Sequence, residues 1–481
     1  MSDASKARSG IVQGIRWNIV TTVLRRTMSL ALLLALASWL SQSDLGLFRT
    51  YSLILTMLTI FAVLGMDSNV ITMKRHRLLA IHSFAQLGIG FSVIISIVMV
   101  FIAQSFGNLY HSKELVILLR CTSIFVVVEA LRRLLRSIAQ VRLKFKELAL
   151  AETWNVVFYC SLSFAVIPFY RHVWVYVVAY YLGNLVECLF LAYYLKPIPT
   201  LRFKRLFSLK WMGYSTAIIA RYKAFLLNVS AIHLLNTYAG NAPILFLGTF
   251  VEAASMGQYF FASQLIGVPV VMFTTAVGQV LYPVFAQSER ERTITNINTY
   301  ARLTLALGMP LLMLYAFGLG KLVPGFFGDK WNEAVALLFC LMPFFGSSML
   351  NDPISGIPFV YRKPHYELVW NIVSLTLRII ALWFGLGYGF VVAVLCFSLV
   401  SALMNLLFYL MSLILLRASI KDALRQLLMR GLIIAGLGYA FYMAYNTPFA
   451  LLYGAAIFAL YVALLYLFSG QVIRDFMRVV L

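Results

Sequence analysis

The sequence predicts an all-α integral membrane protein with about 14 transmembrane helices, and two observations support this class. Hydrophobic residues make up 62% of the 481 residues and charged residues only 12%. A soluble protein of this length would need more charge to cover its surface. Apolar runs of about 17–25 residues, long enough to cross a bilayer as helices, recur from one end of the chain to the other.

Fourteen segments have the length and apolarity of membrane spans, and short connections join them. The expected spans are centred near residues 25, 56, 92, 124, 158, 184, 228, 270, 312, 345, 376, 400, 438 and 458. No connection is long enough to form a soluble domain, so the spans themselves must carry the function.

Two basic stretches without a span divide the predicted helices into groups. Lys196–Trp211 follows six spans, and Arg417–Arg430 follows six more. We therefore expect an N-lobe in residues 1–200, a C-lobe in residues 201–416 and two additional spans in residues 417–481. Two pseudo-symmetric six-helix lobes are a common plan in secondary transporters.

The Lys and Arg residues between the spans predict the orientation. With connections assigned alternately to the two sides, one side holds 26 of these residues and the other holds 4. The larger number includes the six from Arg132 to Lys146. Cytoplasmic loops carry the excess of positive charge, so both termini are expected in the cytoplasm. The net charge of +22 then reflects topology and contact with anionic lipid headgroups, and it does not require nucleic acid as a partner.

Two adjacent arginines lie inside the first predicted span. An arginine near the centre of a bilayer costs about 2.5–3.5 kcal/mol, so each needs a physical reason. A polar stripe spaced by three or four residues runs along this span and contains Asn18, Thr21, Thr22, Arg25 and Ser29. We expect Arg25 to face a cavity. Arg26 lies about 100° further round the helix and is expected to pack against a neighbouring helix or a lipid headgroup.

Polar faces also occur on three other predicted spans. Arg49 in the second span begins a stripe with Ser52, and Arg378 in the eleventh span shares a face with Glu367. The seventh span opens with two basic residues and is polar well into the membrane. We therefore expect a water-filled, positive cavity, with these candidate substrate-binding residues: Arg25, Arg49, Arg221, Lys223, Arg378, Asn18 and Asn228.

Acidic residues in the spans are few, and three are candidates for a charge partner or an ion-coupling group: Glu129, Glu187 and Asp352. Glu129 lies one helical turn from Arg133, which favours a local ion pair. Glu187 is expected to partner a cation from another helix. The charge inside the spans stays positive and favours an anionic substrate, since arginine matches phosphate oxygens with paired hydrogen bonds. Fixed ion pairs or snorkelling anchors remain the alternative for each arginine.

The sequence offers little support for an enzyme. Its five cysteines are scattered over separate spans without a CxxC spacing, and its six histidines form no paired ligand motif. We therefore expect no catalytic residues, no metal and no cofactor. A membrane glycan polymerase or ligase remains an alternative, although the short connections opposite the basic side offer few acidic residues for its chemistry.

Five short segments follow one another in an order that is typical of one transporter family. They are Gly46–Arg49, Arg142–Lys146, Gly248–Tyr259, Leu281–Gln287 and Phe326–Ala334. They resemble motifs of Wzx-type flippases, in the polysaccharide transporter branch of the MOP (multidrug, oligosaccharidyl-lipid, polysaccharide) superfamily. The resemblance covers roughly residues 10–415. One departure is Asn241, where this family usually has Asp.

The resemblance implies a V-shaped pair of six-helix lobes in the inner membrane of a bacterium. Such proteins move undecaprenyl-pyrophosphate-linked oligosaccharides, the repeat units of O-antigen, capsule or exopolysaccharide, from the inner to the outer leaflet by alternating access. Cations of the first two spans and of the second lobe engage the pyrophosphate in similar flippases. Arg25, Arg49, Arg221 and Lys223 stand at comparable positions here. A polysaccharide polymerase and a chain-length regulator are the implied protein partners.

A cation-coupled drug antiporter of the same superfamily is the remaining alternative. Such a protein would favour a carboxylate in the cavity of the first lobe, where the first span offers arginines. A binding site of that kind selects organic cations, whereas a site rich in arginine selects anions. The two hypotheses therefore differ in the sign of the charge that the substrate carries.

Overall fold

The computed structural model describes residues 2–63, 77–142, 144–195, 234–235, 237–238, 240–361 and 363–468. Every regular element in these ranges is a helix. Eleven of the described helices are long and apolar enough to cross a membrane. The predicted all-α membrane class is therefore confirmed. The predicted span near residue 228 lies outside the described residues.

The chain forms two compact units, Met1–Gly257 and Gln258–Leu481. We refer to them as unit 1 and unit 2 and describe each by itself. The predicted boundary between the lobes falls at residues 200 and 201, which lie outside the described residues. The division into lobes at this position therefore stays a prediction.

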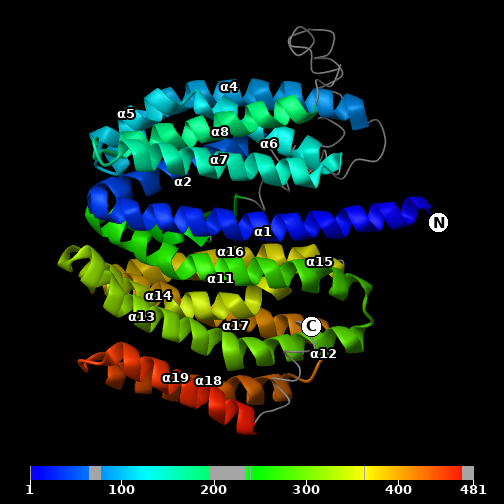
Figure 1. Cartoon of the computed structure of the whole chain (residues 1–481), viewed down its shortest axis with the longest axis vertical. Coiled ribbons are helices and arrows are strands. Elements are labelled where there is room, and N and C mark those ends of the chain that lie inside the picture. The colour runs from blue at the N-terminus through cyan, green and yellow to red at the C-terminus, as the bar shows by residue number, and fades with distance from the viewer. Residues whose placement is uncertain are drawn as a thin grey trace. The chain divides into compact units, whose positions relative to one another are not determined.

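Unit 1 is a bundle of long helices with one interrupted span. Its helices are α1 (Ser2–Trp39), α2 (Gln42–Val63), α4 (Arg77–Leu109), α5 (Lys113–Thr122), α6 (Phe125–Val141), α7 (Phe145–Val166) and α8 (Val173–Leu195). Helix α7 packs against α1 and α8, and α6 packs against α2, α4 and α8 (Figure 1). A turn at residues 123–124 separates α5 from α6, and together they occupy the position of the span expected near residue 124.

Local capping explains where two of these helices begin. Ser41 and Asp44 form a reciprocal cap at the start of α2, in which the Asp44 amide donates to the Ser41 hydroxyl at 3.1 Å. The Ser41 hydroxyl in turn donates to the Asp44 carboxylate at 2.7 Å. The Leu115 amide donates to the hydroxyl of Ser112 at the start of α5. These side chains satisfy amide groups that have no partner within the helix.

Two glycines allow the start of α2 to contact the start of α11 (Ala253–Gln287). A Cβ atom at Gly46 would lie 1.9 Å from the carbonyl oxygen of Ala253, and one at Gly257 would lie 1.9 Å from that of Gln42. Both distances are far below van der Waals contact, so no side chain fits at either position. Both glycines belong to segments on which the family resemblance rests, and this contact is a physical reason for their presence.

Unit 2 contains most of α11 and the remaining helices. They are α12 (Arg290–Leu303), the π-helical segment η1 (Thr304–Gly308), α13 (Met309–Phe327), η2 (Asp329–Trp331), α14 (Asn332–Asn351), η3 (Asp352–Ile354), α15 (Ile357–Val360), α16 (Pro364–Leu386), α17 (Phe390–Leu415), α18 (Ile420–Tyr445) and α19 (Ala450–Phe468). Helix α17 packs against α14 and α16, while α18 and α19 pack against each other and against α13.

Two segments of the resemblance meet in unit 2. The Gln258 side chain donates to the carbonyl of Lys330 at 2.6 Å and accepts from the amide of Ala334 at 3.0 Å. Between these points Trp331 is fully buried. Gly328 has a φ of 78°, a conformation that favours glycine. The turn between α13 and α14 is therefore fixed by one glutamine and one buried ring.

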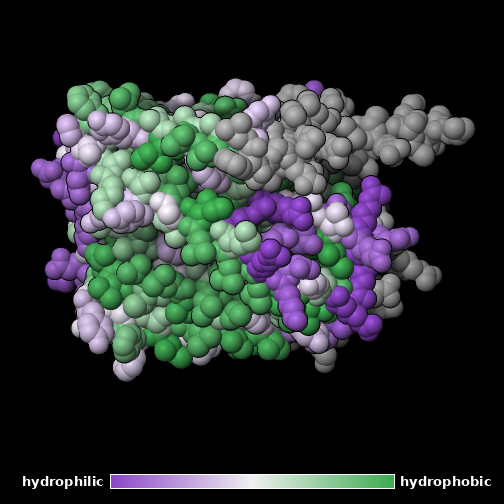
Figure 2. Space-filling view, turned by 90° about the horizontal axis from the view of Figure 1, so that it is seen from below, coloured by the Kyte–Doolittle hydropathy of each residue, from purple (hydrophilic) through white to green (hydrophobic). Residues whose placement is uncertain are grey.

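The face of unit 2 that carries α18 and α19 is largely apolar. Figure 2 shows apolar side chains over the middle of this face and hydrophilic ones gathered at its ends. Leu428 and Leu432 on α18 and Leu452 and Leu460 on α19 are all exposed. A contiguous apolar surface of this kind is unfavourable in water. It suits contact with lipid chains, since α18 has its backbone groups paired within the helix.

Candidate functional site

Unit 1 contains a group of ion pairs that joins four helices, and we call it the charged cluster. Its seven members come from α1, α6, α7 and α8, and they are Arg25, Arg132, Arg133, Arg136, Glu129, Glu152 and Glu187. Four positive and three negative charges leave the cluster with one positive charge in excess.

Glu187 on α8 lies at the centre of the charged cluster, and its side chain is 0% exposed. Its Oε1 accepts from Nε of Arg136, and its Oε2 lies 3.2 Å from Nη1 of Arg132. The side-chain amide of Asn155 also donates to Oε2, at 2.6 Å. Three donors thus surround the buried carboxylate. A charge in an environment of low polarity needs this degree of pairing to remain ionised.

Glu129 on α6 holds two arginines of its own helix. Arg132 contacts it through two parallel hydrogen bonds, of 2.8 Å from Nε and 2.5 Å from Nη2. The Arg133 Nε lies 3.3 Å from the same carboxylate. The ion pair predicted between Glu129 and Arg133 is therefore confirmed, and Arg132 is the closer partner. Glu187 also partners cations from another helix, as predicted.

Arg25 on α1 joins the charged cluster through Glu152 of α7. Its Nη1 forms an ion pair with Glu152, whose other oxygen lies 3.3 Å from Nη1 of Arg136. Arg25 also donates to the Thr21 carbonyl and to the Thr22 hydroxyl, at 3.2 and 3.1 Å. Arg136 therefore bridges Glu152 and Glu187, and a series of ion pairs connects Arg25 on α1 to Glu187 on α8.

Three of the four helices that carry the charged cluster, α1, α7 and α8, contain candidate membrane spans. Glu152 is seven residues from the start of the candidate span Phe145–Val166, and Glu187 is eight residues from the end of Val173–Leu195. At 1.5 Å per residue, both carboxylates lie about 10–12 Å from the nearest helix end. The ion pairs of these two carboxylates are therefore not surface ion pairs.

A small polar cavity adjoins the charged cluster. Its volume is about 60 Å³, and its lining includes Glu129 and Arg133 of α6, hydroxyl groups of α2, and two tyrosines of α8. The lining residues with hydroxyl groups are Tyr51, Ser52, Thr56, Thr59, Tyr180 and Tyr181. A cavity of this size and polarity has room for water molecules or for the oxygens of one anionic group.

The structure places the other predicted site residues apart from the charged cluster or leaves them outside its description. Arg221, Lys223 and Asn228 lie outside the described residues. Asn18 lies in α1, where its side chain is not among those described. Arg26 is exposed on α1, next to the half-buried Arg25.

Arg49 on α2 contacts the position at which this chain departs from the related family. Its Nη2 donates to Oδ1 of Asn241 at 2.6 Å, and the Asn241 amide donates to the carbonyl of Thr237 at 2.9 Å. Asn241 therefore acts as a neutral acceptor for Arg49. An Asp at this position would instead form an ion pair with Arg49.

Arg378 and Asp352 lie in unit 2. Arg378 is buried, its guanidinium carbon lies 5.7 Å from the ring centre of Phe344 and 6.0 Å from that of Phe397, and its Nη2 lies 3.5 Å from Oδ1 of Asn405. Asp352 lies close enough to Arg378 for their charges to interact. The expected grouping of Arg25, Arg49 and Arg378 around one cavity is not tested, because Arg378 belongs to unit 2 and the other two to unit 1.

Three members of the charged cluster were not recognised from the sequence. Arg132 and Arg136 were counted only as loop residues in the prediction of orientation, but α6 carries them close to three glutamates. Glu152 was not considered as a partner of Arg25. A signal was present in the spacing, because Glu152, Asn155 and Tyr159 follow one another by three and four residues along one face of α7.

Comparison with known proteins gives one family and several relatives. The family described as "Polysaccharide biosynthesis protein" matches residues 35–336. The lipopolysaccharide biosynthesis protein WzxC of Escherichia coli (strain K12) is 23% identical over 386 residues, which are 79% of this chain and 75% of WzxC. The teichuronic acid biosynthesis protein TuaB of Bacillus subtilis (strain 168) is 25% identical over 141 residues, 29% of each chain.

Two solved structures share the fold. The lipid II flippase MurJ in an inward closed conformation matches with a TM-score of 0.69 at 15% identity, over 93% of this chain and 98% of that one. An inward-facing multidrug resistance transporter of the MATE family, in the MOP superfamily, matches with a TM-score of 0.54 at 15% identity, over 83% and 98%. The resemblance to Wzx-type flippases of the MOP superfamily is thus confirmed, and the chain belongs to the family of polysaccharide biosynthesis proteins.

Proposed function

We propose that this protein moves an undecaprenyl-pyrophosphate-linked oligosaccharide from the inner to the outer leaflet of a bacterial inner membrane. The main support is that a charged cluster with an excess of arginine joins α6 to three candidate membrane spans in a polysaccharide biosynthesis protein. A buried positive site favours an anionic group. The pyrophosphate is the anionic group that every substrate of this class shares.

The outer members of the charged cluster are the ones that can exchange partners. The side chains of Arg133, Arg136 and Arg25 are 29%, 28% and 22% exposed, whereas Glu187 is 0% exposed. Arginine forms paired hydrogen bonds with phosphate as readily as with carboxylate. A pyrophosphate oxygen would therefore take the place of Glu152 on Arg25, while Glu187 holds Arg132 and Arg136 in position.

The remaining steps follow from the chemistry of the substrate. Its lipid tail stays in the bilayer, and its glycan passes along hydroxyl groups such as those of Ser52 and Thr56 beside the charged cluster. Rocking of two lobes would expose the site to each side in turn, as in other transporters built from repeated halves. Glu129, Glu187 and Asp352 are the candidate groups for coupling this movement to an ion.

The alternative of a drug antiporter has support from the fold alone. The likeness to the MATE family transporter has a TM-score of 0.54, against 0.69 for the lipid II flippase. An organic cation would meet four arginines at the charged cluster, so its binding there is electrostatically unfavourable. The positive charge of an antiporter's substrate is therefore unfavourable at the charged cluster of unit 1.

Transport in a purified system tests the proposal. The protein is placed in liposomes with an undecaprenyl-pyrophosphate oligosaccharide that carries a fluorophore on its glycan, and an impermeant quencher reports which leaflet holds the label. We expect the protein to expose the labelled glycan lipid but not a phospholipid with the same fluorophore on its headgroup. Equal movement of both lipids, or of neither, would contradict the proposal. Uptake of a fluorescent organic cation instead would favour the antiporter.

A further inference from the structure

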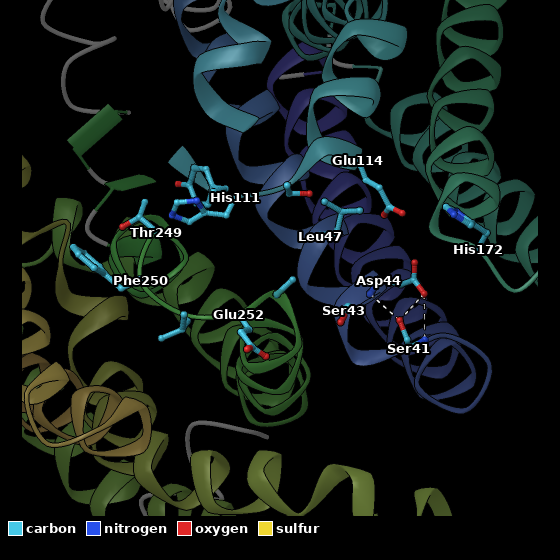
Figure 3. A pocket seen from close by; sticks show the side chains of 14 residues that line it. Ser41, Ser43, Asp44, Leu47, His111, Glu114, His172, Thr249, Phe250 and Glu252 are labelled. Carbon is cyan, nitrogen blue, oxygen red and sulfur yellow. Dashed lines mark hydrogen bonds between the residues drawn. The ribbon is translucent and has the colours of Figure 1, made fainter. Parts of the chain in front are cut away.

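A larger cavity, of about 680 Å³, lies at one end of unit 1 (Figure 3). Its lining comes from the connections after α1, α4 and α7 and from the segment before α11. Each of these connections ends a helix that runs away from the side on which α1 begins. The cavity therefore opens on the side opposite the N-terminal end of α1, which is the outer side in the predicted orientation.

The lining of this cavity has a distinctive chemistry. Among the residues that the structure describes, the lining has no Lys or Arg, and its polar side chains are carboxylates, imidazoles and hydroxyls. Helix capping already accounts for Ser41, Asp44 and Ser112. The other groups need a different explanation.

Two carboxylates and one aromatic ring stand out among the remaining groups. Glu114 lies on α5, and Glu252 and Phe250 belong to the segment before α11 (Figure 3). Among the residues that the structure describes, neither glutamate has an ion-pair partner. The Phe250 side chain is 63% exposed. The Phe250 ring contacts that of Phe246, with 5.1 Å between the ring centres, and leaves most of its surface exposed at the cavity.

Sugars combine the two surfaces that these side chains match. The axial C–H groups of a pyranose present an apolar face that stacks on an aromatic ring, and its hydroxyls donate hydrogen bonds to carboxylates. Hydrogen bonds to a charged acceptor are among the stronger ones. The absence of cations from the lining disfavours uronic acids and other acidic sugars, because like charges would be brought together.

The walls of the cavity are preformed. The Tyr110 hydroxyl donates to the carbonyl of Leu245 at 3.2 Å, and burial raises the pKa of Tyr110 to about 12, so the tyrosine stays a donor. The glycine contact between the starts of α2 and α11 fixes the wall that carries Glu252. Binding in a preformed site loses little conformational entropy.

We propose that this cavity binds neutral or amino-sugar residues of the glycan on the side opposite the N-terminal end of α1. The inference rests on the proposed function and adds the sugar class and the place where the glycan is held. Phe250 stacks on one sugar ring, and Glu252 and Glu114 accept hydrogen bonds from hydroxyl or ammonium groups of the glycan at other points of the cavity. The site would retain the glycan after the pyrophosphate has left the charged cluster.

Binding of soluble oligosaccharides to the full-length protein in nanodiscs tests this inference. The probes are chitotriose, the corresponding glucosamine trimer and a galacturonic acid trimer, with dissociation constants measured by calorimetry. We expect the first two to bind and the acidic trimer to bind at least about tenfold more weakly. F250A and E252Q should each weaken binding by about five- to tenfold, the loss of one good contact.

Matched variants in unit 2 control for nonspecific effects. Phe326 is an exposed phenylalanine of α13 and Glu291 an exposed glutamate of α12, so F326A and E291Q should leave binding unchanged. The inference is overturned if no probe binds, if the acidic trimer binds as tightly as the others, or if F250A and E252Q bind like the controls. With lipid-linked transport intact, any of these results leaves the proposed function standing. Variant-sensitive binding without transport would refute the proposed function alone.

Discussion

The two units stabilise buried charges by different interactions. The ion pairs found among the described residues all lie in unit 1, where each carboxylate of the charged cluster holds two arginines. In unit 2, the buried Arg378 is surrounded by two aromatic rings and the amide of Asn405. Unit 1 thus compensates its buried charges through close ion pairs, whereas Arg378 in unit 2 is stabilised by aromatic rings, an amide and an interaction with the charge of Asp352.

This difference predicts how each unit responds to substitution. Removing one partner from a network of ion pairs leaves the other charges buried without compensation, which is strongly destabilising. Removing Arg378 takes one cation from two aromatic rings, the Asn405 amide and the charge of Asp352, each with a modest loss of interaction energy. Unit 1 should therefore be sensitive to single substitutions and unit 2 tolerant of them.

The largest effect is expected for Glu187→Ala. This change leaves Arg132 and Arg136 without their shared carboxylate at a site with no solvent access. We expect a loss of about 3–5 kcal/mol in the free energy of unfolding, measured by detergent titration in mixed micelles. Glu147→Gln is the control, since its exposed pair with Lys144 spans 4.0 Å and should contribute less than about 1 kcal/mol. Equal stability of the two variants would show that the charged cluster does not stabilise unit 1.

An intermediate effect is expected where unit 1 depends on backbone contact. Gly257→Ala places a methyl group 1.9 Å from the Gln42 carbonyl, and neither backbone segment can yield easily. We expect a destabilisation of about 1–3 kcal/mol by the same titration. Gly90→Ala on α4 meets no atom within 4 Å and should be neutral or stabilising by up to about 1 kcal/mol. A neutral Gly257→Ala would show that the start of α11 does not contact α2 closely.

The smallest effect is expected for Arg378→Met. Methionine fills a similar volume, and its thioether makes favourable contacts with rings such as those of Phe344 and Phe397. We expect a change within about 1 kcal/mol, because relief from the cost of burying the guanidinium offsets the lost interactions with the Asn405 amide and with the charge of Asp352. Arg136→Met in unit 1 should be far more destabilising. Similar losses of unfolding free energy for Arg378→Met and Arg136→Met would show that the two units do not differ in their sensitivity to the removal of a buried charge.

Local patterns in the sequence predicted one part of the charged cluster well. Glu129 and Arg133 are four residues apart on one helix, so their ion pair follows from helix geometry alone. The need of Glu187 for a partner was also predictable, because an isolated charge in a span is costly. The fold class was predictable because a bilayer admits only helices or closed barrels as spanning structures, and the apolar runs have the length of helices.

The remaining contacts depend on tertiary structure. Arg136 and Glu187 are 51 residues apart, and nothing in either local segment specifies the other. The arginines of α6 also lower its apolarity, so hydropathy alone assigned them to a loop. Their charges are compensated by carboxylates from α7 and α8, which hydropathy cannot detect. The partner of Arg25 was missed for the same reason, since Glu152 lies in another helix.

Two adjacent arginines on α1 allow a direct test of whether the charged cluster binds the pyrophosphate. Arg25 belongs to the charged cluster, whereas Arg26 is exposed on the same helix. We would measure transport of the fluorescent undecaprenyl-pyrophosphate glycan in liposomes with equal amounts of folded Arg25→Gln and Arg26→Gln protein. We expect at least about a tenfold loss of rate for Arg25→Gln, the equivalent of one charged hydrogen bond, and a near-normal rate for Arg26→Gln. Equal rates for the two variants would contradict this expectation.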